Sequence, residues 1–469
     1  MPTRKSTNPE SPIFFTKPWD AVNVRRGDAL GLRALTDEFA DAVAPDLSNR
    51  VSDGRWVTIL AWCLVQSHGV FVKSGGTAVK TRSEQGKRYG WLRPLELMWV
   101  ARTIQVESES HRGRGLAGQQ AVKKWCENDY KSERPFAMTP DQYRRYRQAG
   151  MYGGYRVAFR RWPGLTQDGD GWTPGPATNE LAKRLDEKLG AGARPKWKVG
   201  NGGGGKNFPE RVNKEQQDKE HVWWIKHWEK FDKKGPNAEH DTLPRRGDDT
   251  KKLPEWNLLK KVAFGDDTKG KIRVEVACAI AEADGADHAS ICAHLSKQFA
   301  SDPAIAALSR FSRLADAGIN AMNLIKRVLG DKPAVKVSEV ANHRDAKVVC
   351  RALVAAAQQW DGTKIVGFRH IDAGHQFADC FKALGKDQVD QCLKKLLAHH
   401  EEHRGGLCWF VLLRNGEIEP RTLPRTANDG FYRFRLWALC RLATQCGVIK
   451  PMPTAFGVEP ADDGEDDNG

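Results

Sequence analysis

The stretch TPDQYRRYRQAGMYGGYRVAFRRWPGL, residues 139–165, alternates arginines with aromatic residues along most of its length. It contains four of the chain's seven tyrosines, and no acidic residue follows Asp141 within it. Guanidinium groups match the geometry of phosphate oxygens, and aromatic rings can stack on the faces of bases. This mixture of residues therefore predicts contact with nucleic acid.

The helix signals in this stretch predict a helical hairpin. Thr139, followed at once by a proline, is expected to cap a first helix that ends near Gly150. The pair Gly153-Gly154 permits a tight turn or a close approach of another part of the chain, because glycine has no side chain to clash there. A second helix is expected over residues 155–162, before Pro163 and the glycine after it stop it.

Two interpretations of the second helix follow from the spacing of its side chains. Tyr155, Phe159 and Trp162 are separated by four and three residues, so they share one face of a helix. Arg156 and Arg160 lie one turn apart on another face. In one interpretation the arginines contact phosphate. In the other, the rings fill a core and the arginines meet only water.

The charge of the chain also favours a polyanionic partner. The 469 residues include 74 Lys and Arg and 59 Asp and Glu, which gives a formal net charge of +15. Residues 1–165 hold 27 of the basic and 16 of the acidic residues, so most of the excess lies there. A basic region of this kind attracts nucleic acid. The side chains expected to contact it are Arg144, Arg145, Arg147, Tyr152, Arg156, Arg160 and Arg161 of the central stretch, with Lys80, Arg82, Lys87 and Arg88 of a basic, glycine-containing loop.

The sequence predicts a mainly α protein of two helical domains, with a small β-hairpin in the C-terminal domain. A chain of this length exceeds what one hydrophobic core usually organises. The expected segments are a basic N-terminal arm (1–27), a basic helical domain with the Arg/Tyr hairpin (28–190), a Gly-rich linker (191–206), a second helical domain with the late β-hairpin (207–458) and a disordered acidic tail (459–469).

Apolar periodicity locates the other elements. Asp28 is expected to cap an amphipathic helix. The apolar residues of 55–67 surround the helix axis, which predicts a helix at the middle of its domain. One helix is expected over residues 341–360. The hairpin is expected where the apolar run 407–413 meets the pair Asn415-Gly416, because this dipeptide favours a two-residue hairpin turn.

The motifs argue against several classes of site. The ten cysteines include no C-x-x-C pair, which disfavours a zinc ribbon and favours a reducing cytoplasm. Gly200–Lys206 fits the phosphate-loop expression, but Asn207 stands where a Ser or Thr would bind magnesium. The longest apolar run, residues 56–72, is too short and too polar to span a membrane, and no apolar signal segment precedes it. We expect no cofactor, no metal and no membrane association.

Two histidine groups leave a catalytic alternative open. His399 and His403 stand one helical turn apart, the spacing at which two imidazoles can share a zinc ion. Arg369 precedes His375 by six residues, which resembles the arginine-to-histidine motif of helical ribonucleases of toxin and defence systems. If the chain is an enzyme, the expected activity is that of a nuclease that uses His370 and His375 or the His399–His403 cluster.

Two further segments carry a resemblance. Residues 44–50, APDLSNR, are followed by Arg55-Trp56 and Ala61-Trp62, and the element YGGYR occupies residues 152–156. Both segments resemble parts of uncharacterised bacterial proteins encoded in phage-defence gene clusters, although Asp46 stands where glycine is expected. The resemblance implies a bacterial, anti-phage setting and transfers no catalytic residue.

The predicted function is nucleic-acid binding, with DNA weakly favoured over RNA. The chain is expected to act in the cytoplasm as a non-catalytic component of a multi-protein bacterial system. Two alternatives to this binding component stay open. A nuclease would cleave its nucleic-acid ligand, whereas a scaffold would use the same basic faces to bind an acidic protein partner. Salt-dependent affinity for intact nucleic acid separates the three.

Overall fold

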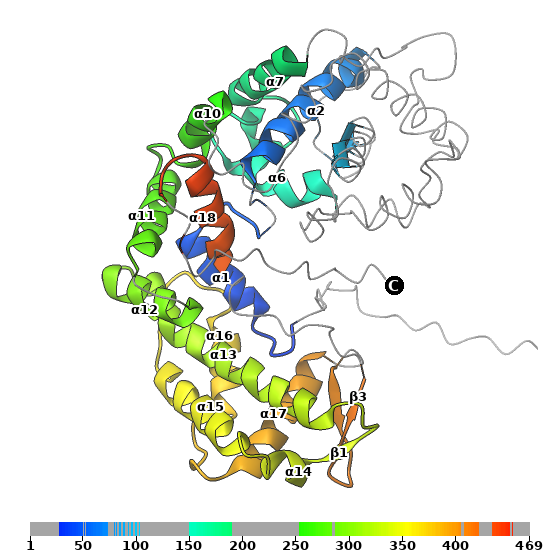
Figure 1. Ribbon diagram of the computed structural model, residues 1–469, viewed down its shortest axis with the longest axis vertical. Helices are drawn as coiled ribbons and strands as arrows, with labels where there is room; N and C mark the ends of the chain where they lie inside the picture. The colour runs from blue at the N-terminus through cyan, green and yellow to red at the C-terminus, as the bar shows by residue number, and fades with distance from the viewer. Residues whose placement is uncertain are drawn as a thin grey trace, which may run out of the picture. The chain divides into compact units, whose positions relative to one another are not determined.

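The computed structural model describes residues 28–49, 51, 53–73, 150–189, 253–283, 287–404, 408–421 and 434–450, with single positions and pairs between 79 and 103 and position 453. The described residues are mainly helical, and one small antiparallel sheet lies toward the C-terminal end of the chain (Figure 1). The predicted fold class is confirmed. Within these ranges, no helix combines the length and the apolar character needed to cross a membrane.

The chain divides into two compact units, and neither is continuous in sequence. The sheet unit comprises Met1–Arg33, Leu314–Asp361 and Asp372–Ala427, and the helical unit comprises Ala34–Arg313, Gly362–Ile371 and Asn428–Gly469. The predicted linker, residues 191–206, lies outside the described residues, but the segments on both sides of it belong to the helical unit. The structure therefore groups the chain differently from the predicted division at this linker.

Polar residues mark the starts of several helices of the helical unit. Asp267 and Asp287, for example, cap two of them by accepting hydrogen bonds from backbone N–H groups of the first turn. The described elements are α1 (Arg33–Val43) without its first residue, α2 (Gly54–Lys73), α6 (Met151–Arg161), the 3-10 turn η2 (Gln167–Gly169), α7 (Pro176–Leu189), α10 (Pro254–Ala263), α11 (Thr268–Glu282), α12 (His288–Gln298), the first part of α13 (Pro303–Leu329) and α18 (Leu436–Gln445).

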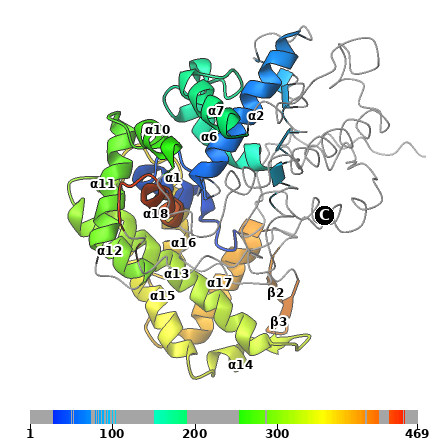
Figure 2. The same cartoon turned by 45° about the horizontal axis from the view of Figure 1, so that its top comes forward.

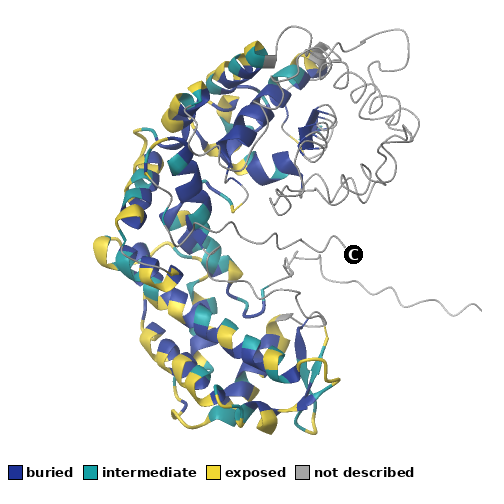
Figure 3. Cartoon of the chain, viewed as in Figure 1, coloured by how far each residue is buried: buried dark blue, intermediate teal, exposed yellow. Residues whose placement is uncertain are grey.

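Helix α2 is buried among neighbouring helices of the helical unit. Its neighbours include α6, α7 and α10, and α7 runs beside it (Figure 2). All residues from 53 to 64 are buried, so the first turns of α2 are dark in Figure 3. The ring of Trp62 packs edge-on against Trp99, with the ring centroids 6.0 Å apart. A helix that is apolar on every side is stable only when neighbours cover every side.

The sheet unit combines helices with a three-stranded sheet in the order β1-β3-β2, in which both pairs are antiparallel. Figure 1 shows the strands beside α14 and α17, which contact β1 and β2 respectively. The described elements are the rest of α13, β1 (Val335–Lys336), α14 (Val337–Ala341), α15 (Ala346–Trp360), α16 (Ile371–Asp379) without its first residue, α17 (Val389–Arg404), β2 (Phe410–Leu412) and β3 (Glu417–Pro420).

The hairpin of β2 and β3 confirms the predicted one. Leu412 pairs with Ile418 across it, and Gly416 N donates to Leu413 O over 3.0 Å. Gly416 has a φ of +80°, a conformation that glycine adopts without strain. The third strand, β1, was not predicted. It is two residues long, and Val335 pairs with Ile418 of β3.

The helix predicted over residues 341–360 begins later in the structure, and only its first residue, Ala341, belongs to the preceding helix α14. Helix α14 ends at Ala341, and α15 begins at Ala346. His343 forms the break: its Nδ1 accepts from Asp345 N at 3.2 Å, and its carbonyl accepts from Ala346 N at 2.9 Å. A side chain that bonds to the nearby backbone offers an alternative to the helical pattern, which explains the interruption.

Candidate nucleic-acid interface

The central stretch is described from Gly150 onward, and it forms one helix, α6, over Met151–Arg161. Of the two possibilities predicted for Gly153-Gly154, the tight turn is wrong, because both glycines lie in the first turn of this helix and Gly154 N donates to Gly150 O over 3.1 Å. The close approach is the one that the structure shows. Gly154 O also accepts a hydrogen bond from Ser48 Oγ at 2.9 Å. Gly154 is buried, and because it has no side chain the segment before α2 can pack directly against its backbone. The predicted first helix, residues 139–149, lies outside the described residues.

The three rings of the second predicted helix face the interior. Tyr155, Phe159 and Trp162 are exposed by 2%, 0% and 2%. The Tyr155 hydroxyl donates to Asp53 O and accepts from Asp53 N, both at 3.2 Å. The predicted shared face is confirmed, and it is a core face. These rings are therefore not available to stack on bases.

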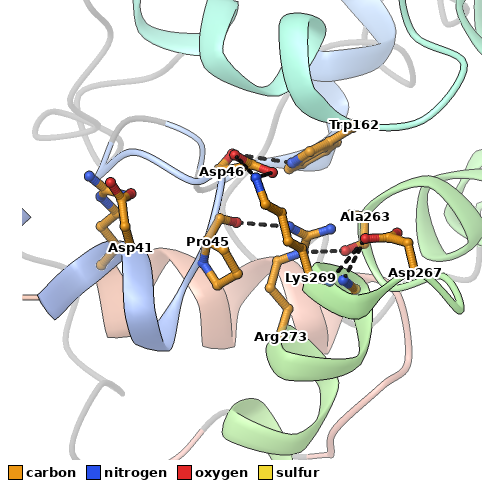
Figure 4. A network of polar contacts seen from close by, with 10 residues as sticks. Asp41, Pro45, Asp46, Trp162, Ala263, Asp267, Lys269 and Arg273 are labelled. Atoms are coloured by element: carbon orange, nitrogen blue, oxygen red, sulfur yellow. Dashed lines mark hydrogen bonds and ion pairs between the residues drawn. The ribbon is translucent and has the colours of Figure 1, made fainter. Parts of the chain in front are cut away.

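A polar network holds the C-terminal end of α6 (Figure 4). Trp162 Nε1 donates to Asp46 O at 3.2 Å, and a carboxylate oxygen of Asp46 lies 2.8 Å from Lys269 Nζ of α11. The guanidinium carbon of Arg273, also on α11, lies 5.9 Å from the centroid of the Trp162 ring. The residue that ends α6 is thereby fixed against both α11 and the segment between α1 and α2.

Arg273 is the buried cation of this network. It donates from Nη1 to Pro45 O at 2.8 Å, and from Nε to the carbonyl of Ala263, the last residue of α10 (Figure 4). Burial lowers the pKa of Arg273, and the carboxylates of Asp267 and Asp46 oppose this shift. The guanidinium thus supplies donors to two backbone carbonyls from separate parts of the chain.

Asp46 has a φ of +57°, and it occupies the position where the resemblance to phage-defence proteins leads one to expect glycine. We expect Asp46→Gly to change the free energy of unfolding by less than about 1 kcal/mol, because relief of backbone strain offsets the loss of a partly exposed ion pair. Asp46→Ala should lose about 1–2 kcal/mol, since it keeps the strain and loses the carboxylate. Urea unfolding measures both. Equal stability of the two variants would show that this backbone conformation has no energetic consequence.

The structure places two predicted arginines on the exposed side of α6. Arg160 and Arg161 are exposed, and none of the described residues forms an ion pair with either. Arg156 is half-buried: its Nη2 donates to Gln85 Oε1 at 2.9 Å, and its guanidinium carbon lies 5.1 Å from the centroid of the Trp172 ring. Arg160 and Arg161 are therefore the described arginines of the stretch whose charge meets solvent.

Two other predicted contacts lie inside the helical unit. Arg88 donates to Ser67 Oγ and Leu64 O, and the Tyr152 ring packs against Trp172 with the centroids 5.0 Å apart. Both side chains are buried, so they cannot reach a phosphate at the surface, and their assignment as nucleic-acid contacts is corrected. The remaining predicted contacts lie outside the described residues; they are Arg144, Arg145, Arg147, Lys80, Arg82 and Lys87.

A loop that the sequence interpretation did not identify supports Arg160. The carboxylate of Asp170 accepts from Trp172 N at 2.5 Å and from the N and Oγ1 of Thr173 at 2.9 and 2.5 Å. Gly171 has a φ of +77°, and a Cβ there would lie 2.6 Å from Arg160 Cγ, so the arginine stem crosses this glycine. The sequence signal is the Asp-Gly pair followed by residues with N–H donors, which is typical of a turn bonded by the Asp side chain.

Two histidines of the predicted cluster hold backbone in the sheet unit. His399 Nε2 lies 2.9 Å from Leu30 O, and His400 Nδ1 lies 2.7 Å from Ala29 O. Trp409 N donates to His400 Nε2 at 2.7 Å. Both imidazoles are buried. Within the described part of the chain, no three His, Cys, Asp or Glu side chains are grouped so that they could hold a metal ion.

His370 has a different environment, in the helical unit. Its side chain is 52% exposed, and its Nδ1 lies 3.1 Å from a carboxylate oxygen of Glu38. The same carboxylate accepts from the backbone N–H groups of Arg369 and His370 at 2.8 and 3.1 Å. His370 is thus an exposed imidazole that a carboxylate orients.

Comparisons of the chain with family models, with curated proteins and with solved structures found no match. The proposal below therefore depends on the geometry and the charge of the chain's own residues.

Proposed function

We propose that this chain binds nucleic acid through the phosphate backbone, as a non-catalytic component of a multi-protein bacterial anti-phage system. The observation that carries the proposal is the exposed pair Arg160-Arg161 at the end of a helix whose rings are buried. The formal charge of +15, concentrated in residues 1–165, supports it. The anti-phage setting follows from the resemblance of residues 44–50 and 152–156 alone.

The buried rings define the kind of binding that we propose. Tyr155 and Phe159 belong to the core, so base stacking by these residues has no support. Arginine contacts to phosphate fix position and carry no sequence information of their own. The end of α6 is held by the Asp46 network, and a helix end that is already fixed loses less conformational freedom on binding. We therefore expect salt-dependent affinity with little sequence preference, and duplex DNA is the first ligand to test.

The double substitution Arg160→Gln and Arg161→Gln tests this interface. It should leave the fold intact, because an exposed substitution usually changes the free energy of unfolding by no more than about 0.5 kcal/mol. The affinity for duplex DNA should fall. The slope of log K against log salt should become shallower by about two units, one for each lost phosphate contact. Filter binding over a range of salt concentrations, with duplex DNA, single-stranded DNA and RNA, measures both quantities.

The matched control removes two exposed charges elsewhere in the helical unit, by Lys183→Gln and Lys261→Gln. This control should keep the wild-type slope of log K against log salt. It removes the same amount of charge but leaves the proposed phosphate contacts of Arg160 and Arg161 in place. An unchanged slope in the arginine variant would remove Arg160 and Arg161 from the interface. Wild-type binding weaker than about millimolar at low salt would remove the function itself and favour a scaffold for an acidic protein. Cleaved nucleic acid, with cleavage lost in His370→Ala, would favour the nuclease.

A further inference from the structure

Arg88 places a positive charge inside the helical unit without a paired carboxylate. Its side chain is 0% exposed, and it donates to three neutral oxygens: Ser67 Oγ at 2.9 Å, Leu64 O at 2.9 Å and Trp172 O at 3.4 Å. None of the described carboxylates lies within ion-pair distance of it. Burial lowers the pKa of Arg88 to about 10, so the group stays cationic at neutral pH. Buried charges are normally paired, because an uncompensated one is strongly destabilising.

Three buried donors at this place have no acceptor. Among the described residues, Arg88 Nε, Tyr152 Oη and Trp172 Nε1 form no hydrogen bond. The indole N–H and the guanidinium Nε–H can only donate, so the partner that suits them is an acceptor. Buried donors in native proteins are rarely unsatisfied, and a bound water or ion is one of the partners that accounts for an exception.

The three donors belong to one cluster, in which a second guanidinium takes part. The ring centroids of Tyr152 and Trp172 are 5.0 Å apart, and Arg88 donates to the carbonyl of Trp172. The guanidinium carbon of Arg156 lies 5.1 Å from the Trp172 centroid. Burial raises the pKa of Tyr152, and the charges of Arg88 and Arg156 oppose this shift. The side chains of Arg88, Tyr152 and Trp172 are therefore neighbours in the interior, and the half-buried Arg156 lies beside them.

Two described carboxylates, Asp170 and Glu96, act on the cluster through their charge, and neither forms an ion pair with Arg88. Asp170 accepts hydrogen bonds from the backbone of Trp172 and from the N–H and the hydroxyl of Thr173. Glu96 accepts from the Tyr89 hydroxyl at 3.1 Å. Asp170 influences Arg88 from beyond ion-pair distance, as its effect on the pKa of Arg88 shows. The charge of Arg88 is thus compensated only at longer range.

We propose that Arg88, Tyr152 and Trp172 bind a compact phosphate group inside the helical unit. A tetrahedral oxyanion offers acceptor oxygens in several directions, together with the negative charge that Arg88 lacks. The three side chains are buried, so the ligand is small, and the site is separate from the surface contacts proposed for Arg160 and Arg161. The phosphate is either the free inorganic ion or the phosphate of a mononucleotide. This inference does not depend on nucleic-acid binding.

Thermal unfolding of the full-length protein tests the site. The protein is dialysed into chloride buffer and titrated with inorganic phosphate or with AMP, and potassium chloride at equal ionic strength serves as the reference. A ligand of the native state raises the Tm, and once its concentration exceeds the Kd the rise grows with the logarithm of that concentration. Inorganic phosphate is expected to do so if the free ion is the ligand, and AMP alone if the mononucleotide is. A rise no larger than that given by chloride, with both ligands, overturns the proposal.

Variants of the cluster make the test specific. Tyr152→Phe removes one donor without opening a cavity, and it should weaken the apparent phosphate affinity by about tenfold or more. In chloride it should be no less stable than the wild type, because the lost hydroxyl had no partner. Arg88→Met should abolish the phosphate effect, whereas Lys183→Gln should keep it. If Arg88→Met does not fold, Tyr152→Phe and Trp172→Phe decide the question, and unchanged affinity in both contradicts the site.

Discussion

Replacing Glu255 by leucine is expected to lower the free energy of unfolding by about 3–5 kcal/mol, because it removes the carboxylate from a buried guanidinium. Glu255, in the first turn of α10, forms an ion pair with Arg55 of α2, and their side chains are 2% and 1% exposed. Lys188 Nζ lies 3.7 Å from the second carboxylate oxygen, but this lysine is 33% exposed and can turn to solvent. Arg55 has no such route to water.

A double variant separates charge from packing at this site. Arg55→Met with Glu255→Leu removes both charges of the buried pair, so it should recover much of the stability that Glu255→Leu loses. Lys188→Met should cost less than about 1 kcal/mol, since it removes only a partly exposed partner. Urea unfolding at neutral pH, followed by tryptophan fluorescence, gives all three values. A double variant as unstable as the single one would show that packing, and not the buried charge, accounts for the loss.

Acidification is expected to remove about 3 kcal/mol of folding stability through His399 alone. Burial lowers the pKa of this imidazole to about 4 in the folded chain, from an ordinary value of 6.5. The hydrogen bond to Leu30 and the charge of Glu402 oppose the shift, and His403 and His400 add to it. Between pH 6.5 and 4 the unfolded chain therefore binds more protons than the folded one. The contribution is fully present above pH 6.5 and is lost as the pH falls through this window.

The variant His399→Gln isolates this effect. Glutamine keeps an N–H donor near Leu30 O but does not titrate, so the variant should show a shallower dependence of unfolding free energy on pH between 4 and 6.5. Carboxylates that titrate at the lower end of this range act on both proteins alike. Urea unfolding at several pH values measures the two slopes. Equal slopes would contradict the assignment of the pH dependence to His399.

The buried face of α6 could be predicted because it depends on local spacing alone. Tyr155, Phe159 and Trp162 share a face in any regular helix, and a face of three rings is stable only when it is covered. The same reasoning located the hairpin at Asn415-Gly416, since the turn needs a residue with positive φ. At these two places the local preference of the residues agrees with the fold, so the sequence alone predicts the structure.

The wrong predictions concern residues whose role is decided by distant partners. Gly153-Gly154 has the composition of a turn, yet Ser48 bonds to Gly154 and the helix continues through it. Arg88 stands in a basic, glycine-containing segment that suggests a surface loop, whereas α2 supplies two of its hydrogen-bond acceptors inside the unit. Strand β1 has two residues, so it carries no periodicity and exists only because β3 pairs with it.

Arg273 gives two helix ends a common support. Pro45 follows the last turn of α1 and Ala263 ends α10, and the carbonyls of both accept from this one side chain. Lysine could not replace it, because a single ammonium lacks the planar fork that reaches two carbonyls in fixed directions. The two helix ends, although far apart in sequence, are therefore coupled through Arg273 of α11. A substitution that moves the backbone at Pro45 also disturbs the support of Ala263, and the reverse holds as well.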